Sequence, residues 1–519
     1  MTPVVYTPLS AEYFALRDKL TTSVIRTGRS RGRQTRGPTL IAGVAGALTN
    51  DVAPGDVIVA TEIRHLSRTA RGEAGGRPAP PAGSAASTDP AARGEPPDEL
   101  RVVACPGAEL VAGELRRLGM TVHLGPIVTT DHVVDSVVER AGLAAGGAIA
   151  VDTESGLLAG DDGQTVVVRV VVDTPSEPLR RLGMPARGIK ALAQLRRTAP
   201  AIDAWARAVG ERELLLAAPR SFCAGVERAI DTVERALEQF GAPVYVRRQI
   251  VHNRHVVNDL ERRGAVFVDE LDAVPEGSLV VLAAHGVAPA VRRQADERHL
   301  RVIDATCPLV AKVHHEVRRY AARDTTVVLI GHPDHEEVIG TMGEAPEHVI
   351  VVASPTEAET VEVPDPAKVG YAMQTTLAVE EAAETAAVLR RRFPALTGPR
   401  RDDICYATSN RQAGVREIAE RSDLVIVLGS QNSSNSKRLA EVAEAAGTRA
   451  VLVDDAGELE LDLLAGAERI GITAGASAPP ELVDNLIRCL SGLGPVSVTE
   501  SGTLTEDVRF ALPKEVSQP

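Results

Sequence analysis

The stretch from residue 331 to residue 340 reads GHPDHEEVIG and places two histidines and two glutamates within six positions. Such a group could bind a metal, or it could carry out proton and phosphate chemistry beside a metal that other residues hold. A zinc-dependent hydrolase of the HExxH type needs a histidine four residues after His335, but that position is Ile339. The HExxH type is therefore excluded, and the choice between metal binding and proton or phosphate chemistry for His335 and Glu337 stays open at this point.

Three of the five cysteines share one sequence context. Cys223 in SFCAG, Cys307 in DATCP and Cys405 in DDICYAT each lie where a predicted strand gives way to a helix, a context that Cys105 and Cys489 share only in part. The amides and dipole of a helix N-terminus favour a thiolate. The close CxxC pairs of structural zinc sites are absent, and three thiolates without a fourth fit an iron–sulfur cluster with one iron open to substrate. The alternative is that they are inert core residues.

These side chains must be positioned by a repeated strand pattern. Five short apolar runs end in small and polar residues: SLVVLAAHG, RVIDATC, TTVVLIGHPDHE, DLVIVLGSQNSS and RIGITAGAS. Such runs are typical of parallel strands buried on both faces, and the residues beyond their carboxyl ends line the ligand crevice. Those positions hold His285, Cys307, His335, Ser433 and Ser477. A strand at 214–218 and a helix at 226–240 open this region.

The first 200 residues predict a separate α/β domain. A strand, a turn and a second strand are expected in TLIAGVAGALTNDVAPGDVIVATEI, and a helix is expected at 108–118, followed by further strands. The Pro-, Gly-, Ala- and Ser-rich stretch at about 72–99 has no periodicity and is interpreted as a disordered insertion or linker.

Bulk composition excludes several classes of protein. A formal net charge of -13 over 519 residues argues against sequence-independent nucleic-acid binding, which needs basic patches. No apolar run reaches the roughly 18 residues of a membrane span. The N-terminus has neither the basic region nor the apolar stretch of a signal peptide. We therefore expect a cytoplasmic protein that binds neither nucleic acid nor membranes.

The segment from about 213 to 513 resembles the 4-hydroxy-3-methylbut-2-enyl diphosphate reductase (LytB) family. The motifs are PRSFCAGVERAI, YVRRQIVHNRHVV, AAHGV, DATCPLVAKVH, HEEVIGTMG, MQTTL, RDDICYATSNRQ, GSQNSSNSKRL and TAGASAP, in family order. The resemblance implies three similar α/β sub-domains in a pseudo-threefold arrangement around one [4Fe-4S] cluster per chain. It also implies reductive dehydroxylation of a small allylic diphosphate to isopentenyl and dimethylallyl diphosphates, the last step of the non-mevalonate isoprenoid pathway, with ferredoxin or flavodoxin as electron donor.

The resemblance also assigns roles to residues. It implies that the cluster ligands are Cys223, Cys307 and Cys405, that Glu337 delivers the proton, and that Thr375 positions the substrate hydroxyl and relays the proton. Implied substrate-binding residues are His252, His285, His335, Thr375, Ser433, Ser434, Asn435 and Ser477. The family usually has proline where this chain has Glu336, which we expect to be an exposed extra charge without a role.

Residues 1–200 resemble, more faintly, the nucleoside phosphorylase and nucleosidase superfamily. AEYFALRDKL, AVDTESGLLA and VVVRVVVDT place Glu12 at an acidic position, Glu154 at the ribose contact and Asp173 at the general acid. The region 28–39 is shorter than the family's first phosphate- or water-binding loop and helix. We therefore interpret this domain as a degenerate one with a role in regulatory nucleoside binding or docking, and purine nucleosidase or phosphorylase-like activity is the alternative. We expect boundaries at 1–200 and 211–513.

A non-enzymatic alternative treats the chain as a nucleotide-binding scaffold with structural cysteines. It predicts a colourless protein after anaerobic purification, whereas a reductase should be brown and oxygen-sensitive, with about four irons per chain.

Overall fold

The computed structural model describes residues 2–28, 37–67, 99–180, 183–399, 403–502 and 504–517. They form two compact units. Unit 1 comprises Met1–Glu211, Glu460–Gly466 and Arg488–Pro495, and unit 2 comprises Arg212–Leu459, Ala467–Ile487 and Val496–Pro519. Positions 29–36, and positions 72–98 of the expected insertion, lie outside the described residues.

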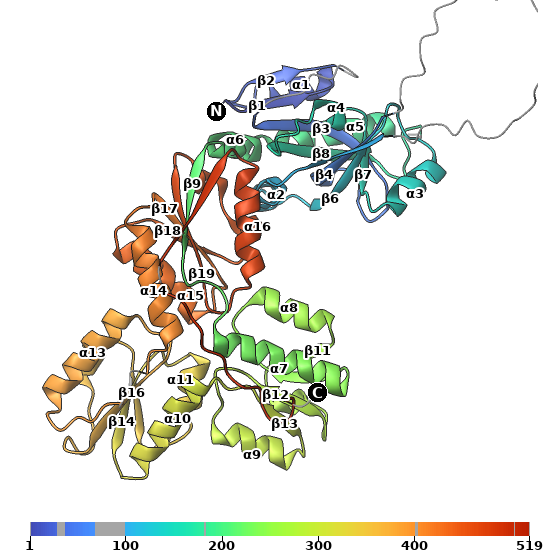
Figure 1. Ribbon diagram of the computed structural model, residues 1–519. Coiled ribbons are helices and arrows are strands. Elements are labelled where there is room, and N and C mark those ends of the chain that lie inside the picture. Colours follow the sequence, from blue (N-terminus) through green and yellow to red (C-terminus); the bar gives the residue numbers. More distant parts are fainter. Residues whose placement is uncertain are drawn as a thin grey trace, which may run out of the picture. The chain divides into compact units, whose positions relative to one another are not determined.

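Unit 1 is built on one mixed, eight-stranded sheet (Figure 1). Its strands are β1 (Val4–Thr7), β2 (Val24–Arg26), β3 (Thr39–Ala47), β4 (Val57–Ser67), β5 (Glu99–Ala104), β6 (Val122–Thr129), β7 (Ala150–Asp152) and β8 (Thr165–Asp173). They lie in the order β2-β1-β3-β7-β6-β4-β5, and β8 pairs with β3 and β4. Every residue of β8 is buried, as its almost continuous valine sequence requires.

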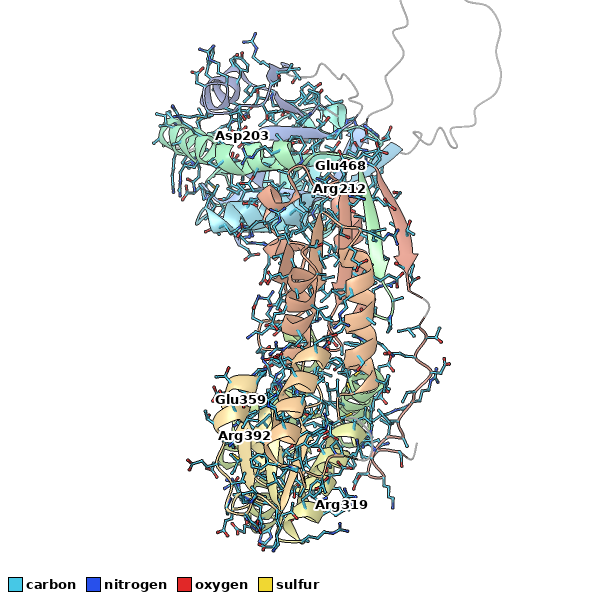
Figure 2. The ribbon with its side chains drawn as sticks, turned by 90° about the vertical axis from the view of Figure 1, so that its left-hand side faces the viewer. Asp203, Arg212, Arg319, Glu359, Arg392 and Glu468 are labelled. Carbon is cyan, nitrogen blue, oxygen red and sulfur yellow. The ribbon has the colours of Figure 1, made fainter. Side chains whose placement is uncertain are left out.

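Helices and two distant chain segments cover this sheet. The helices are α1 (Ser10–Leu16), α2 (Ala108–Arg117), α3 (Val137–Ala145), α4 (Ser155–Leu158), α5 (Met184–Arg197) and α6 (Ala199–Ala208), which carries Asp203 (Figure 2). The 3-10 helix η3 (Leu461–Leu464) joins them: the Leu461 amide donates to Glu114 Oε1 over 2.6 Å, and Arg207 Nη2 pairs with Asp462 at 2.8 Å. Sequence patterns give no sign that residues 460–466 belong to this unit.

Unit 2 contains three parallel sheets, each the centre of one sub-domain. The first sub-domain has β10 (Val244–Arg247), β11 (Ala265–Val268), β12 (Leu279–Leu282) and β13 (Arg301–Asp304), in the order β11-β10-β12-β13. The second has β14 (Thr326–Ile330), β15 (Val349–Val352) and β16 (Val369–Met373), in the order β15-β14-β16. The third has β9 (Arg212–Ala217), β17 (Leu424–Leu428), β18 (Ala450–Val453), β19 (Arg469–Ala474) and β20 (Val496–Ser501), in the order β18-β17-β19-β9-β20.

We call Cys223, Cys307 and Cys405, each of which directly precedes a long helix, the junctions of unit 2. The helix after each junction packs on the sheet of its sub-domain. Helix α7 (Ala224–Phe240) belongs to the first sub-domain with α8 (Arg254–Arg262), η1 (Leu271–Ala273) and α9 (Pro289–Glu297). The second has α10 (Pro308–Ala321), α11 (Glu336–Met342), α12 (Pro355–Thr360) and α13 (Val379–Arg392), whose side chains include Arg319, Glu359 and Arg392 (Figure 2). The third has α14 (Tyr406–Ala419), α15 (Ser434–Ala445), η2 (Ala456–Glu458) and α16 (Pro480–Ser491), whose last residues fall in unit 1.

The predicted fold class is confirmed in both halves of the chain. The strand expected at 214–218 is β9, the helix expected at 226–240 is α7, and the helix expected at 108–118 is α2. Each helix after a junction buries a small apolar face, as Ala229, Val233 and Ala236 of α7 do against Val244 and Val246. Within the described residues, no helix combines the length and apolarity that crossing a membrane requires.

Candidate active site

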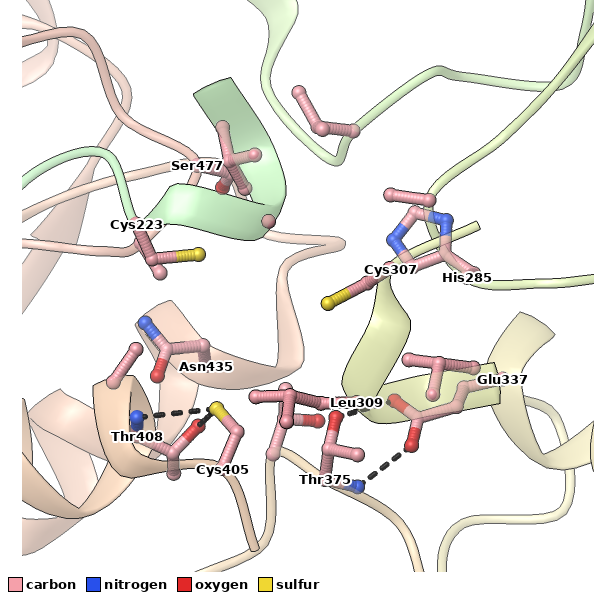
Figure 3. A pocket seen from close by; sticks show the side chains of 18 of the residues that line it. Cys223, His285, Cys307, Leu309, Glu337, Thr375, Cys405, Thr408, Asn435 and Ser477 are labelled. Carbon is pink, nitrogen blue, oxygen red and sulfur yellow. Dashed lines mark hydrogen bonds between the residues drawn. The ribbon is translucent and has the colours of Figure 1, made fainter. Parts of the chain in front are cut away.

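One cavity in unit 2 is lined by residues of all three sub-domains (Figure 3). It contains every side chain that the sequence predicts for the reductase site: Cys223, His252, His285, Cys307, His335, Glu337, Thr375, Cys405, Ser433, Ser434, Asn435 and Ser477. Its volume is about 110 Å³. One water needs roughly 10–15 Å³, so the cavity can hold more than a single ion.

The three cysteines occupy equivalent places in the fold. Each is the N-cap of the helix that follows a junction: Cys223 precedes α7, Cys307 precedes α10 and Cys405 precedes α14. Their amides donate to the carbonyls of Ala476, Ala284 and Thr375, at 3.2, 2.9 and 3.1 Å. Each of those carbonyls lies two residues beyond the end of β19, β12 or β16. The same local structure therefore brings a thiol to the cavity from three directions.

Two further loop positions, defined by their distance from a strand end, also recur in each sub-domain. His252, His335 and Ser433 each lie five residues after the end of β10, β14 or β17. His285 and Ser477 lie three residues after β12 and β19, and the third equivalent position, after β16, is Thr376. The polar lining is thus set by the register of loops that leave neighbouring parallel strands at one edge of each sheet.

Burial changes the expected state of the thiols. It raises the pKa of Cys307 to about 11 and that of Cys405 to about 12, and it raises the pKa of Cys223 as well. Helix amides lower the pKa of each thiol, as the sequence predicts, while burial raises it by more. Thiols of this kind lose their protons when a metal binds.

The space between the thiols fits a group larger than one ion. In the part of the chain that the structure describes, no three His, Cys, Asp or Glu side chains are grouped closely enough to hold a single metal ion. A Cβ added at Gly225 would lie 2.7 Å from the sulfur of Cys307 and 3.8 Å from that of Cys223. Glycine at this position keeps open the space that a cluster bound by both sulfurs would need.

Three histidine rings form one wall of the cavity. The rings of His252 and His285 stack at 4.0 Å between centroids, and His335 meets them edge-on at 5.6 and 5.9 Å. Burial lowers the pKa of His252 and His335 to about 4, and that of His285 well below its ordinary value. All three imidazoles are therefore neutral before an anion binds.

A carboxyl group and a threonine form a further part of the lining. Glu337 is 2 % exposed and accepts hydrogen bonds from the amide of Thr375 at 2.6 Å and from its hydroxyl at 2.9 Å (Figure 3). Burial raises the pKa of Glu337 to about 7, although both hydrogen bonds oppose the shift. A carboxyl group that holds its proton near neutral pH is suited to general acid catalysis.

The segment NSSNS begins helix α15 and supplies amide and hydroxyl groups. Ser433 caps the helix, and Ser477 donates to the carbonyl of His252 at 2.9 Å. Asn435 is 5 % exposed, and both polar atoms of its amide are buried without a hydrogen-bond partner among the described residues. An unsatisfied buried amide is costly, so it indicates a polar ligand in the cavity.

Sequence reasoning missed several residues of the site. Thr376 lines the cavity and donates to Ser434 Oγ at 3.1 Å; the repeated position after β16 could have identified it. Thr408 donates its amide to the Cys405 sulfur at 3.3 Å (Figure 3). Phe510 lines the cavity from the C-terminal segment, and no local pattern marks it.

Arg411 stabilises the backbone that carries Cys223. Its guanidinium is fully buried and donates to the carbonyls of Ser221 at 2.7 Å and Phe222 at 3.0 Å, directly before Cys223. The charge is balanced by Glu506 of the C-terminal segment, at 3.0 Å. Arg411 lies on α14, which Cys405 caps, so it ties two cysteine-bearing junctions together.

Glu336 is not the exposed extra charge that the sequence predicts. Its side chain is 21 % exposed, and its carboxylate lies 3.6 Å from Arg248 Nη1 and 3.7 Å from His285 Nδ1. Burial raises its pKa, and Arg248 opposes that shift. The neighbouring His332 accepts from Arg438 at 2.7 Å and does not line the cavity.

Unit 1 has a pocket of its own that contains Glu12, Glu154 and Asp173. Arg140, which is 1 % exposed, contacts the Asp173 carboxylate and donates to the carbonyls of Ala47 and Val134. Glu12 accepts from the amides of Leu9 at 2.7 Å and Val44 at 2.8 Å, and burial raises its pKa to about 6. The three residues that the sequence predicts for a nucleoside site thus share one pocket.

Comparison with known proteins agrees with both halves of the sequence. The family model described as LytB protein matches residues 214–491, which is more than half of the chain, and the model described as Phosphorylase superfamily matches residues 39–159. A 4-hydroxy-3-methylbut-2-enyl diphosphate reductase of Acidothermus cellulolyticus is 57% identical over 307 residues, covering 59% of this chain and 90% of the relative. One from Rhodococcus opacus is 55% identical over 311 residues, covering 60% of this chain and 93% of the relative.

A solved structure shows the same relationship. The E-1-hydroxy-2-methyl-but-2-enyl-4-diphosphate reductase of Plasmodium falciparum is 36% identical and matches with a TM-score of 0.57, covering 59% of this chain and 97% of that chain. Sequence motifs, the three-sub-domain fold and these matches agree, and we conclude that this chain belongs to the LytB protein family.

Proposed function

We propose that unit 2 is a 4-hydroxy-3-methylbut-2-enyl diphosphate reductase. Two electrons and two protons convert the allylic alcohol diphosphate to isopentenyl or dimethylallyl diphosphate and water. The observation that carries the proposal is the meeting, in one cavity, of three helix-capping thiols, three histidines and the Glu337–Thr375 pair. The same observation argues against a scaffold with structural cysteines, since inert core cysteines need no polar lining.

The diphosphate end of the substrate is assigned to the polar wall. His252, His285 and His335 supply imidazoles, Ser433, Ser434 and Ser477 supply hydroxyls, and Asn435 supplies the amide that otherwise has no partner among the described residues. Donors that leave rigid strand ends lose little entropy when they bind phosphate oxygens, so this wall orients the substrate.

The proton donor is assigned to Glu337. The Thr375 hydroxyl, which donates to Glu337 at 2.9 Å, can turn toward the substrate hydroxyl and pass on a proton as that group leaves as water. The second proton goes to the allylic carbon skeleton. Because the acid form is required and the pKa is about 7, turnover should fall as pH rises through that value.

The electron-transfer group is assigned to Cys223, Cys307 and Cys405 as ligands of one [4Fe-4S] cluster. When bound, such a cluster supplies single-electron transfer and a Lewis-acidic iron toward the leaving hydroxyl. The residues fit it: the thiols converge, Gly225 leaves room, and Thr408 donates to the Cys405 sulfur. Two electrons must arrive from outside, and the family resemblance implies ferredoxin or flavodoxin as their donor. We assign the reaction to the reducing cytoplasm, where disulfides rarely form.

Turnover by the full chain tests this proposal. Anaerobically purified protein, given a chemical reductant and the allylic alcohol diphosphate, should release both isoprenoid diphosphates, which are isomers and are distinguished by their proton NMR spectra. A brown protein that releases neither product would overturn the assignment of the reaction.

For unit 1 we propose nucleoside binding, with domain boundaries near 1–200 and 211–513. The supporting observation is the shared pocket of Glu12, Glu154 and Asp173. Regulatory binding is favoured over cleavage, since Arg140 already occupies the Asp173 carboxylate. Calorimetry of the full chain with adenosine and inosine should show binding without release of base, and base release would show cleavage instead.

A further inference from the structure

A diphosphate bound in this cavity would meet no positively charged side chain among the described residues that line it. A diphosphate brings at least two negative charges, yet none of the residues that line the cavity is a lysine or arginine. The three histidines are neutral while the site is free of anion, because burial disfavours their charged forms. Burying an uncompensated anion is expensive, so binding must bring positive charge into the cavity.

A cation lies in an adjoining hollow. This hollow shares His252 with the cavity and is also lined by Arg248, Gln249, Glu336 and Asn432. Arg248 has a φ of 56°, a left-handed conformation that is uncommon for a residue with a side chain and that must be held by its surroundings. Arg248 donates to Glu270 at 3.0 Å and lies 3.6 Å from Glu336.

Glu336 connects this cation to the histidine wall. Its Oε1 faces Arg248, and its Oε2 lies 3.7 Å from Nδ1 of His285. That nitrogen is buried and has no hydrogen-bond partner among the described residues. Closing the gap by about 0.8 Å would form a charge-assisted hydrogen bond of ordinary length.

The other two histidines lack such support. Nδ1 of His335 accepts the amide of Glu337 at 3.2 Å as the cap of α11, so a proton on that atom would break the cap. Nδ1 of His252 lies 3.4 Å from the neutral acceptor Gln249 Oε1 and 3.5 Å from Asn432 Nδ2. Neither group carries a negative charge, and Arg248 opposes a positive charge on the ring by lowering the pKa of His252. Among the described residues, His285 is the only one of the three histidines with a carboxylate close to its Nδ1.

We propose that Glu336 is a positioning residue that holds His285 as the imidazolium when a diphosphate occupies the cavity, with Arg248 holding Glu336. This inference rests on the proposed function. The signs alternate along the line from Arg248 through Glu336 and His285 to the diphosphate, so each neighbouring pair attracts. The proton that binding requires is taken up from solvent.

Other titratable and charged groups also face His285 and Glu336 and affect their charges. His252 and His335 face His285 and oppose its protonation while no anion is present. Arg247 and Glu270 face Glu336, the first stabilising and the second opposing its negative charge. Glu337 follows Glu336 in the chain, but its carboxylate points to Thr375.

Calorimetric titration of the full, cluster-containing chain with inorganic diphosphate tests the proposal. Measurements in two buffers of different ionisation enthalpy give the number of protons taken up. For the unsubstituted chain we expect uptake of about one proton per diphosphate at pH 7.5, and affinity that falls as pH rises through the pKa of His285 in the complex. The Glu336→Gln variant should bind diphosphate about tenfold more weakly than the unsubstituted chain. It should also take up fewer protons per diphosphate, and its affinity should begin to fall at a lower pH.

Two variants complete the design. Glu336→Asp keeps the charge and should restore most of the proton uptake, whereas Glu384→Gln, at an exposed position of α13, should match the unsubstituted chain. Equal affinity and equal proton uptake in the unsubstituted chain and Glu336→Gln would overturn the inference. Failure of the unsubstituted chain to bind diphosphate would instead overturn the proposed function.

Discussion

The two pockets of this chain differ in the partners of their buried carboxylates, amides and imidazoles. In unit 1, the carboxylates already have partners: Asp173 contacts Arg140, and Asp152 pairs with Arg169 at 2.7 Å. In unit 2, the Asn435 amide and His285 Nδ1 are buried without partners among the described residues. Unsatisfied groups reduce stability, so a protein keeps them where a ligand will satisfy them.

The unit 2 pocket thus contains a buried amide and a buried imidazole nitrogen without partners among the described residues, whereas the buried carboxylates Asp152 and Asp173 of unit 1 are paired with arginines. In unit 2, a polar ligand would supply partners for the Asn435 amide and His285 Nδ1. In unit 1, a bound molecule has to compete with ion pairs inside the protein. Ligand removal should therefore destabilise unit 2 more than unit 1.

The largest expected effect is on the cluster. Cys307→Ser should lower iron from about four per chain to near none and remove the brown colour, since two thiols cannot hold the cluster. Iron analysis after anaerobic purification measures this. The matched control is Cys105→Ala, at a buried cysteine of unit 1, which should keep the full iron content. A brown Cys307→Ser protein with unchanged iron would contradict the ligand assignment.

The next effect concerns the proton donor. Glu337→Gln should reduce turnover by about a hundredfold or more while substrate affinity changes little, because the amide keeps the shape but cannot donate an acidic proton. The fall in turnover as pH rises through about 7 should also disappear. Steady-state kinetics across pH, with exposed Glu347→Gln as the control, measures both. Turnover close to that of the unsubstituted chain would remove Glu337 from the mechanism.

A smaller effect is expected in unit 1. Asp173→Asn leaves the buried Arg140 without its counter-charge and should destabilise unit 1 by about 3 kcal/mol. Hydrogen exchange of strand β8 should report the loss, and reductase turnover should stay unchanged. If exchange in β8 does not change, the pair does not carry the stability that distinguishes unit 1.

The smallest effect concerns the ion pair behind the thiols. Glu506→Gln keeps a hydrogen-bond acceptor for Arg411 but removes its charge, and should cost about 1–2 kcal/mol. We expect faster loss of iron to a chelator, because the Ser221–Cys223 turn is held less firmly. An unchanged rate of iron loss would limit Arg411 to a role in folding.

Sequence patterns predicted much of this site for a physical reason. Parallel strands end at one edge of each sheet, so residues such as His285, His335 and Ser433 could be grouped from strand endings alone. Cys223, Cys307 and Cys405 followed from the same logic, since each precedes a helix. The chemical roles came from the family resemblance and not from the spacing.

What could not be predicted depends on distant contacts. Arg411 is held in place by an ion pair with Glu506, which lies 95 residues further along the chain. The burial that raises the thiol pKa values comes from all three sub-domains, and a rule based on the helix end alone does not include it. Glu336 looked like surface charge because Arg248 and His285 are far from it in sequence.

Mössbauer spectroscopy of the iron-57-labelled full chain, with and without the allylic alcohol diphosphate, tests the central claim most directly. The claim is that three thiols hold a cluster whose remaining iron is open to substrate. The account predicts about four irons per chain, one of which has a signal that changes when substrate is added while the others stay constant. An iron-free protein, or a cluster whose signals do not respond to substrate, would contradict it.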